Sequence, residues 1–177
     1  LAATSELILS LEQAAQDSAE SAGTAVATVG ELSVDPSAVN VIPGLVEFSA
    51  DIRDVNQVVI DQLVDSVKAK LQSLEESRGV ETTLECTYEV PPADMAPVCR
   101  DALHGAGDSF NIETVDIHSG AGHDTMKIAA ATDTGLLFAP SQGGHSHSPL
   151  ECTDWWDCAA ATGVLKEAVY NLATIHQ

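Results

Sequence analysis

Basic residues are scarce in this sequence. Only 7 Lys and Arg residues stand against 27 Asp and Glu residues, which gives a formal net charge of −20 over 177 residues. A chain without a basic stripe cannot release counterions from phosphates, so a nucleic acid is a poor partner. An anionic membrane surface is disfavoured for the same electrostatic reason. We therefore expect neither a nucleic-acid partner nor a membrane partner.

Long apolar runs and cysteine motifs are also missing. No stretch approaches the ~18 apolar residues of a transmembrane helix, and the N-terminal residues lack the basic region of a signal peptide. The cysteines, Cys86, Cys99, Cys152 and Cys158, match neither a zinc ribbon nor a CxxC motif. This spacing is typical of reduced thiols in a cytosolic protein. We therefore expect a cytoplasmic location.

The acidic residues are dispersed along the sequence and do not form a tail. At this net charge, self-repulsion opposes the compact state when the ionic strength is low. Lysine is nearly absent, whereas Ala, Thr and Asp are abundant. Because salt screens the repulsion over a few ångströms, we interpret the composition as adaptation to high salt.

The hydrophobic content of 45% is sufficient for a core, and its spacing predicts helices and strands in the first half of the chain. The expected elements are a helix over 2–22, strands over 25–32 and 45–53, a helix over 55–78 and a strand over 80–90. Gly23 and Gly79 are expected to end the two helices. This order corresponds to most of a ferredoxin-like βαββαβ unit that lacks its first strand.

A change of pattern follows Pro91, Pro92 and Pro97, which mark a boundary between two parts of the chain. Beyond it we expect helices over 97–105, 125–131 and 154–176, and strands over 111–117 and 135–140. Each of these strands leads into a glycine-rich loop that contains histidine. The loops read SGAGHD over 119–124 and GGHSHSP over 143–149. Loops that follow strands commonly carry the chemistry of α/β proteins.

The two loops contain residue types suited to metal ligation and proton transfer, while their glycines let the backbone approach a ligand. Asp124 has two interpretations: it orients His123 or polarises a carbonyl together with it, or it caps the helix that follows. His145 and His147 alternate in an extended segment, so a single metal ion takes only one of them. We treat the remaining histidines, His104, His118 and His176, as incidental.

Arg53 is one of few arginines and ends a strand in the sequence Asp51-Ile52-Arg53-Asp54. The fork of its guanidinium matches a substrate carboxylate in bidentate geometry. The alternative is a structural ion pair with Asp51 or Asp54, which is the more common arrangement. Asn40 precedes a Pro-Gly turn, where an Asn side chain usually bonds to nearby backbone and contacts substrate less often.

Motifs in register resemble the M20 metallopeptidase-like amidohydrolases, in particular the branch of N-carbamoyl-L-amino-acid hydrolases, β-ureidopropionases and allantoate amidohydrolases. The matching stretches are Thr28-Val29-Gly30, Asn40-Val41-Ile42-Pro43-Gly44, Asp51-Ile52-Arg53-Asp54, Ser119 to Asp124, and Gly143 to Pro149 followed by Glu151. Any one of them is weak, but together their order and separations cover nearly the whole chain and are specific.

The resemblance implies an α/β fold in two parts. Residues 1–92 would form most of an α+β lid, a ferredoxin-like α/β sandwich through which the family forms homodimers. Residues 93–177 would form the C-terminal segment of an α/β zinc-peptidase-like catalytic domain. The family implies two divalent ions, zinc or manganese, in each complete active site, and a small ureido or amide substrate that carries a carboxylate.

The resemblance also assigns roles to individual residues. It places substrate binding on Asn40, Arg53 and Gly122, catalysis on His123 and Asp124, and metal ligation on His147. His145 stands where the family usually has an aliphatic residue, so the choice between His145 and His147 as the ligand is open.

Several of the family's site residues have no counterpart in the sequence. The first metal-binding His, the bridging Asp, the general-base Glu and the neighbouring metal-ligand Glu are missing. Because zinc sites need about three protein ligands, we expect this chain to be the C-terminal part of such an enzyme and to be inactive alone. The expected reaction cleaves a C–N bond of N-carbamoyl-amino acids or related ureido acids. The alternatives are a non-catalytic dimerisation or ligand-binding fragment, and an M20 aminoacylase or dipeptidase.

Overall fold

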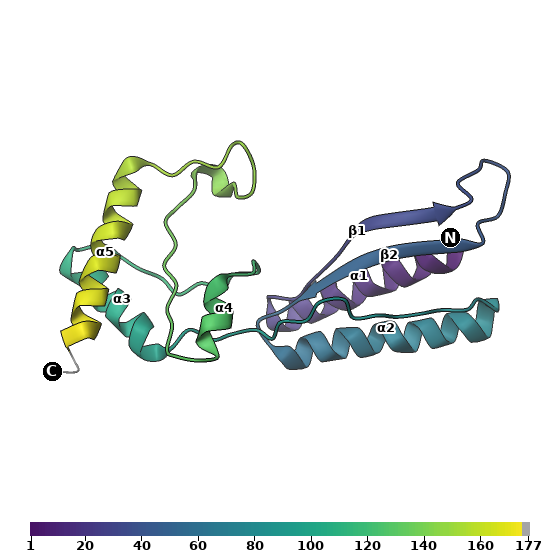
Figure 1. Ribbon diagram of the computed structural model, residues 1–177, viewed down its shortest axis with the longest axis horizontal. Helices are drawn as coiled ribbons and strands as arrows, with labels where there is room; N and C mark the ends of the chain where they lie inside the picture. Colours follow the sequence, from purple (N-terminus) through teal and green to yellow (C-terminus); the bar gives the residue numbers. More distant parts are fainter. Residues whose placement is uncertain (175–177) are drawn as a thin grey trace. The chain divides into compact units, whose positions relative to one another are not determined.

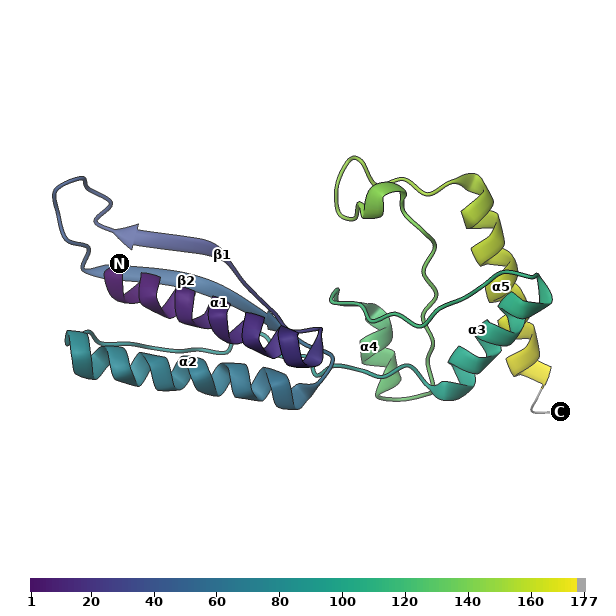
Figure 2. The same ribbon diagram turned by 180° about the vertical axis from the view of Figure 1, so that it is seen from behind.

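The structure is a computed structural model that describes residues 1–174, and its internal contacts divide the chain into two compact units. The first unit comprises Leu1–Pro92 and His118–Gly120, and the second comprises Ala93–Ile117 and the residues from Ala121 onward. Figures 1 and 2 show the elements of each unit from opposite sides. The expected end of the last helix at His176 lies outside the described residues.

The first unit consists of two helices packed beside a two-stranded antiparallel sheet (Figure 1). Its elements are α1 (Ala2–Ala22), β1 (Val26–Asp35), β2 (Leu45–Arg53) and α2 (Gln57–Arg78). The sheet register runs from Val26 opposite Arg53 to Asp35 opposite Leu45, with an irregularity between Val29 and Glu31. Helix α1 packs against both α2 and the sheet.

The ends of the helices follow from their capping residues. Gly23 and Gly79 take left-handed φ values of 80° and 63°, and each amide bonds to a carbonyl of the preceding turn. Only glycine adopts these angles without a steric penalty. At the start of α2 the side chain of Asn56 accepts a hydrogen bond from the amide of Val58 at 3.0 Å. These capping interactions determine where α1 ends and where α2 begins and ends.

The core of the first unit lies where α1 faces α2. Leu7, Leu11 and Ala15 repeat every four residues along α1 and are buried, as are Leu63 and Leu74 of α2. A repeat of four residues places side chains on one face of a helix, which explains how an acidic helix still presents an apolar stripe.

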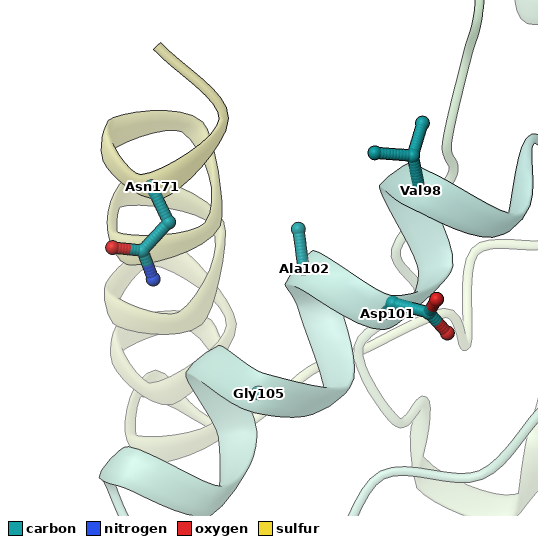
Figure 3. Close-up of a pocket in the computed structure, with 5 residues that line it drawn as sticks. All are labelled: Val98, Asp101, Ala102, Gly105 and Asn171. Atoms are coloured by element: carbon teal, nitrogen blue, oxygen red, sulfur yellow. The ribbon is translucent and has the colours of Figure 1, made fainter. Parts of the chain in front are cut away.

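The second unit contains α3 (Pro97–Ser109), α4 (Asp124–Ala129), the short 3-10 helix η1 (Gln142–Gly144) and α5 (Trp155–Thr174). Helix α3 packs against α5 through a small core of Ala106, Val164 and Ala168. A pocket near these two helices is lined by Val98, Asp101, Ala102, Gly105 and Asn171 (Figure 3). Within residues 1–174, none of the helices has the length and the apolar character that a membrane-spanning segment requires.

The prediction of strands over 80–90, 111–117 and 135–140 is wrong. Within the described part of the chain, β1 and β2 are the only paired strands. Alternating apolar residues favour an extended backbone, but a strand also needs a neighbour that accepts and donates its backbone hydrogen bonds. The expected unit is therefore reduced to α1, β1, β2 and α2. The predicted helices are confirmed with small shifts at their ends, and so is the α/β class.

Candidate functional site

Arg53 lies at the end of β2 and is held at two points. Its Nε donates to Asp51 Oδ1 at 2.7 Å and its Nη2 to Asp51 Oδ2 at 2.5 Å. Its Nη1 donates to the carbonyl oxygen of Gly120 at 2.8 Å, across 67 residues of sequence. Residues 51 and 53 share one face of the strand because side chains alternate. The structural ion pair is thus formed with Asp51, whereas Asp54 binds Thr24 and the amide of Asn56.

The ion pair shifts the protonation of both partners. The hydrogen bond from Arg53 holds the pKa of the Asp51 carboxyl below its ordinary value, against a smaller opposing effect of partial burial. The same hydrogen bond raises the pKa of Arg53. Both groups are therefore charged at neutral pH, and both side chains are about half exposed, at 51% each.

Asn40 lies in the turn that joins β1 to β2, and it is exposed. The turn is closed by a hydrogen bond from the amide of Gly44 to the carbonyl of Asp35 at 2.9 Å. Within residues 1–174, the side-chain amide of Asn40 makes no hydrogen bond, so the expected bond to nearby backbone is not formed. The donors and the acceptor of this amide are therefore unused within the described residues.

The first histidine loop leads directly into α4. His123 is the N-cap residue, and its carbonyl accepts a hydrogen bond from the amide of Met126 at 3.0 Å. Asp124 follows in the first turn, where a negative charge stabilises the helix, but it is not itself the cap. The half-buried His123 ring packs edge-on against Phe138 with 5.5 Å between ring centroids. A Cβ on Gly122 would meet no atom within 4 Å, so packing does not require glycine there.

The second histidine loop is shaped by local hydrogen bonds. Ser141 Oγ donates to the carbonyl of His145 at 2.7 Å, and the amide of His147 donates to Glu151 Oε2 at 2.9 Å. Gly143 has a φ of 65°, and a Cβ there would lie 3.1 Å from the His145 ring. His147 takes a left-handed φ of 55°. The assumption of a continuous extended segment is therefore wrong at His147, and strand alternation does not decide which imidazole binds a metal.

The described residues do not by themselves fit a metal centre. No group of three or more His, Cys, Asp or Glu side chains gathers anywhere in residues 1–174 in a way that could hold an ion. A zinc site needs about three protein ligands. His147 is exposed and remains a candidate for a single ligand, so a complete centre requires ligands from elsewhere.

A second polar cluster connects α3 to the extended segment that precedes the first histidine loop. His104 Nδ1 lies 2.6 Å from Thr114 Oγ1, and His104 Nε2 lies 3.1 Å from Asp116 Oδ1. Arg100 Nη1 donates to the other oxygen of Asp116 at 3.1 Å. Sequence analysis missed this cluster, although the spacing of four residues between Arg100 and His104 places both on one face of a helix.

The two units divide the candidate residues between them. Asn40 and Arg53 belong to the first unit together with Gly120, whereas Gly122, His123, Asp124 and His147 belong to the second. Arg53 and the tripeptide His118–Gly120 are thus brought together within one unit by the hydrogen bond to Gly120.

Comparisons with known proteins cover both units. The family model of the peptidase dimerisation domain, M20_dimer, matches residues 2–78. The chain is 35% identical over 173 residues to the N-carbamoyl-L-amino acid amidohydrolase of Geobacillus stearothermophilus, a match that covers 98% of the chain and 41% of the relative. It is 31% identical over 146 residues to the allantoate amidohydrolase of Bacillus subtilis (strain 168), covering 82% of the chain and 35% of that protein.

The chain is also similar to a solved structure. The chain is similar to an amidase of the hydantoinase/carbamoylase family from Burkholderia multivorans, with a TM-score of 0.83 and 31% sequence identity. This match covers 94% of the chain and 40% of the solved chain. The chain thus spans about two fifths of the length of relatives such as the Geobacillus protein, at 41%.

Proposed function

Because the chain belongs to the M20 family of metallopeptidase-like amidohydrolases, we propose that it forms part of an enzyme that hydrolyses a C–N bond. The proposed substrates are N-carbamoyl-amino acids or related ureido acids. In this proposal residues 1–92 are most of the lid and residues 93–177 are the C-terminal segment of the catalytic domain. The 35% identity to a carbamoyl-amino-acid hydrolase along 98% of the chain supports this substrate class.

The observation that carries the proposal is the geometry of Arg53. Its guanidinium is half exposed, fixed by Asp51 and Gly120, and still has unused N–H donors. A guanidinium prepared in this way binds the carboxylate that lies beside the scissile ureido group. Asn40, whose amide makes no bond within residues 1–174, would contribute a further contact to the same end of the substrate.

The second unit would contribute to the reacting end of the substrate. Gly122 offers an open backbone position. The His123 ring is fixed against Phe138, and with Asp124 it would act on the substrate carbonyl. His147 would be one ligand of a divalent-metal site, zinc or manganese, whose other ligands the described residues do not supply.

We also propose that the protein is a homodimer. The match of residues 2–78 to the peptidase dimerisation domain supports an interface on the first unit. We propose no nucleic-acid partner, because a protein with a net charge of −20 repels the phosphate backbone.

Complementation between two polypeptides tests the proposed reaction. The chain alone, in molar KCl with manganese or zinc, is expected to hydrolyse neither N-carbamoyl-amino acids nor allantoate. A second polypeptide with the N-terminal part of the Geobacillus stearothermophilus relative should restore hydrolysis by supplying the missing ligands. Arg53→Ala should abolish the restored turnover and leave the dimer intact in size-exclusion chromatography.

The outcomes separate the proposal from its alternatives. Turnover by the chain alone would show that it completes its own metal site, which contradicts the proposed division of ligands. A preference for N-acetyl-amino acids or dipeptides in the complemented mixture would identify an aminoacylase or dipeptidase instead. Dimer formation without binding of a carboxylate substrate would favour a non-catalytic dimerisation module.

A further inference from the structure

The donors of Arg53 are unevenly occupied. A guanidinium has five N–H groups, one on Nε and two on each Nη. Asp51 takes the Nε–H and one Nη2–H, and the Gly120 carbonyl takes one Nη1–H. One donor therefore remains on each of Nη1 and Nη2. The ion pair and the carboxylate site, which sequence analysis treats as alternatives, can exist at the same time.

We propose that Asp51 is a positioning residue that decides how a carboxylate reaches Arg53. It keeps the Nε/Nη2 edge of the guanidinium occupied, so an incoming anion is received only by the remaining Nη hydrogens. This inference rests on the proposed function, because it assumes that Arg53 receives the substrate carboxylate. The inference goes beyond the proposed function because Asp51 itself makes no proposed contact with the substrate.

The Asp51–Arg53 ion pair contributes only a little to the stability of the fold. Its partners are both about half exposed, and ion pairs at such positions contribute little to folding because solvent screens them. Orientation is the larger effect. Arg53 is fixed from its own strand by Asp51 and from a distant loop by Gly120, so its flexible side chain is already ordered before a ligand binds.

Asp51 also places a negative charge beside the site. That charge repels any anion that would take the Nε/Nη2 edge, which is the edge a bidentate ligand could otherwise use. A built-in repulsive group of this kind selects between ligands by excluding one mode of binding. The expected ligand is a single carboxylate held at the Nη end.

Nuclear magnetic resonance of the 15N-labelled chain in molar KCl tests the inference directly. Arg53, Arg78 and Arg100 are the only arginines of the sequence, so the Nε–Hε region contains few signals to assign. The probe is N-carbamoylglycine, and the neutral N-carbamoylglycinamide is its control. Binding is followed by the backbone amide signals of β2, and the binding mode by the Arg53 Nε–Hε signal.

In the wild-type chain, the probe should move the amide signals of β2 but leave the Arg53 Nε–Hε signal where it is. In Asp51→Ala, Arg53 Nε–H loses its acceptor, so its signal should shift from the wild-type position and then move progressively as the probe is added. Glu47→Gln is the matched control, because it removes the same charge from the same face of β2 and keeps the contacts of Arg53. It should behave as the wild type does.

Two results would overturn the inference in distinguishable ways. If the wild-type Nε–Hε signal moves with the probe, the ligand displaces Asp51 and the positioning role is refuted, while the carboxylate site itself stands. If β2 amide signals respond equally to the probe and to its neutral amide, Arg53 does not select a carboxylate. The proposed function then loses its principal support, and the role of Asp51 fails with it.

Discussion

A single methyl group added at Gly107 should separate α3 from the extended segment beside it. Gly107 is buried, and a Cβ at this position would lie 2.8 Å from Thr114 Cγ2 and 2.9 Å from the carbonyl oxygen of Ile112. The oxygen belongs to the backbone, so it cannot rotate away as a flexible side chain would. Gly107→Ala therefore has to push residues 112–114 away from the helix.

The magnitude follows from a comparison with Gly105, two residues earlier in the same helix. A Cβ on Gly105 would meet no atom within 4 Å. Replacing a helical glycine by alanine gains about 1 kcal/mol of helix propensity, and both variants receive this gain. Overpacking of a buried position costs about 1–3 kcal/mol. The free energy of unfolding of Gly107→Ala should therefore lie about 1–3 kcal/mol below that of Gly105→Ala.

Urea unfolding in molar KCl, followed by circular dichroism at 222 nm, measures this difference. Gly105→Ala should raise the midpoint relative to the wild type, and Gly107→Ala should fall below Gly105→Ala. The double variant Gly107→Ala with Thr114→Ser removes one of the two clashing atoms and keeps a hydroxyl near His104, so it should recover part of the loss. Equal midpoints for the two alanine variants would refute the close approach of residues 112–114 to α3.

Three further predictions concern the whole chain, a helix cap and the ion pair. Dialysis from molar KCl into dilute buffer should remove the helical circular dichroism, because the charge of −20 is then unscreened; an unchanged spectrum would contradict adaptation to salt. Asn56→Ala should lower the free energy of unfolding by about 0.5–2 kcal/mol in the same urea titration, since the amide of Val58 loses its acceptor. Asn56→Ser keeps a side-chain acceptor at the cap and should retain most of this free energy. Carbon-13 titration should give Asp51 a pKa below its ordinary 3.8, returning toward it in Arg53→Ala. Because the folded-state pKa is lowered, the ion pair stabilises the fold above the ordinary pKa, and this contribution disappears as the pH falls through the folded value.

The helices could be predicted from the sequence because their determinants are local. Leu7, Leu11 and Ala15 recur at the period of the helix, and Gly23 and Gly79 stand where α1 and α2 end. The strand over 80–90 could not be decided in the same way. Its alternation is a property of the segment, whereas pairing depends on a neighbouring strand that the described residues do not include.

The candidate site shows the same division between local and distant causes. Residues two apart in a strand share a face, so the sequence allowed Asp51 to pair with Arg53. It left open whether Arg53 forms this ion pair or binds a substrate carboxylate. The bond from Arg53 to Gly120 spans 67 residues and has no local signal. The sequence did not predict the left-handed backbone of His147 either, because a positive φ is uncommon at any single non-glycine residue, even though histidine adopts it more often than most.

The assignment of His118–Gly120 to the first unit means that a boundary in the sequence is not a boundary in space. The chain leaves that unit after Pro92, returns for three residues and leaves it again. A shortened polypeptide that ends at residue 92 would keep α1, the hairpin and α2, yet Arg53 would lose the carbonyl that fixes Nη1. Insertions and deletions near residues 118–120 would consequently disturb the first unit, although they would lie more than 25 residues beyond Pro92 in the sequence.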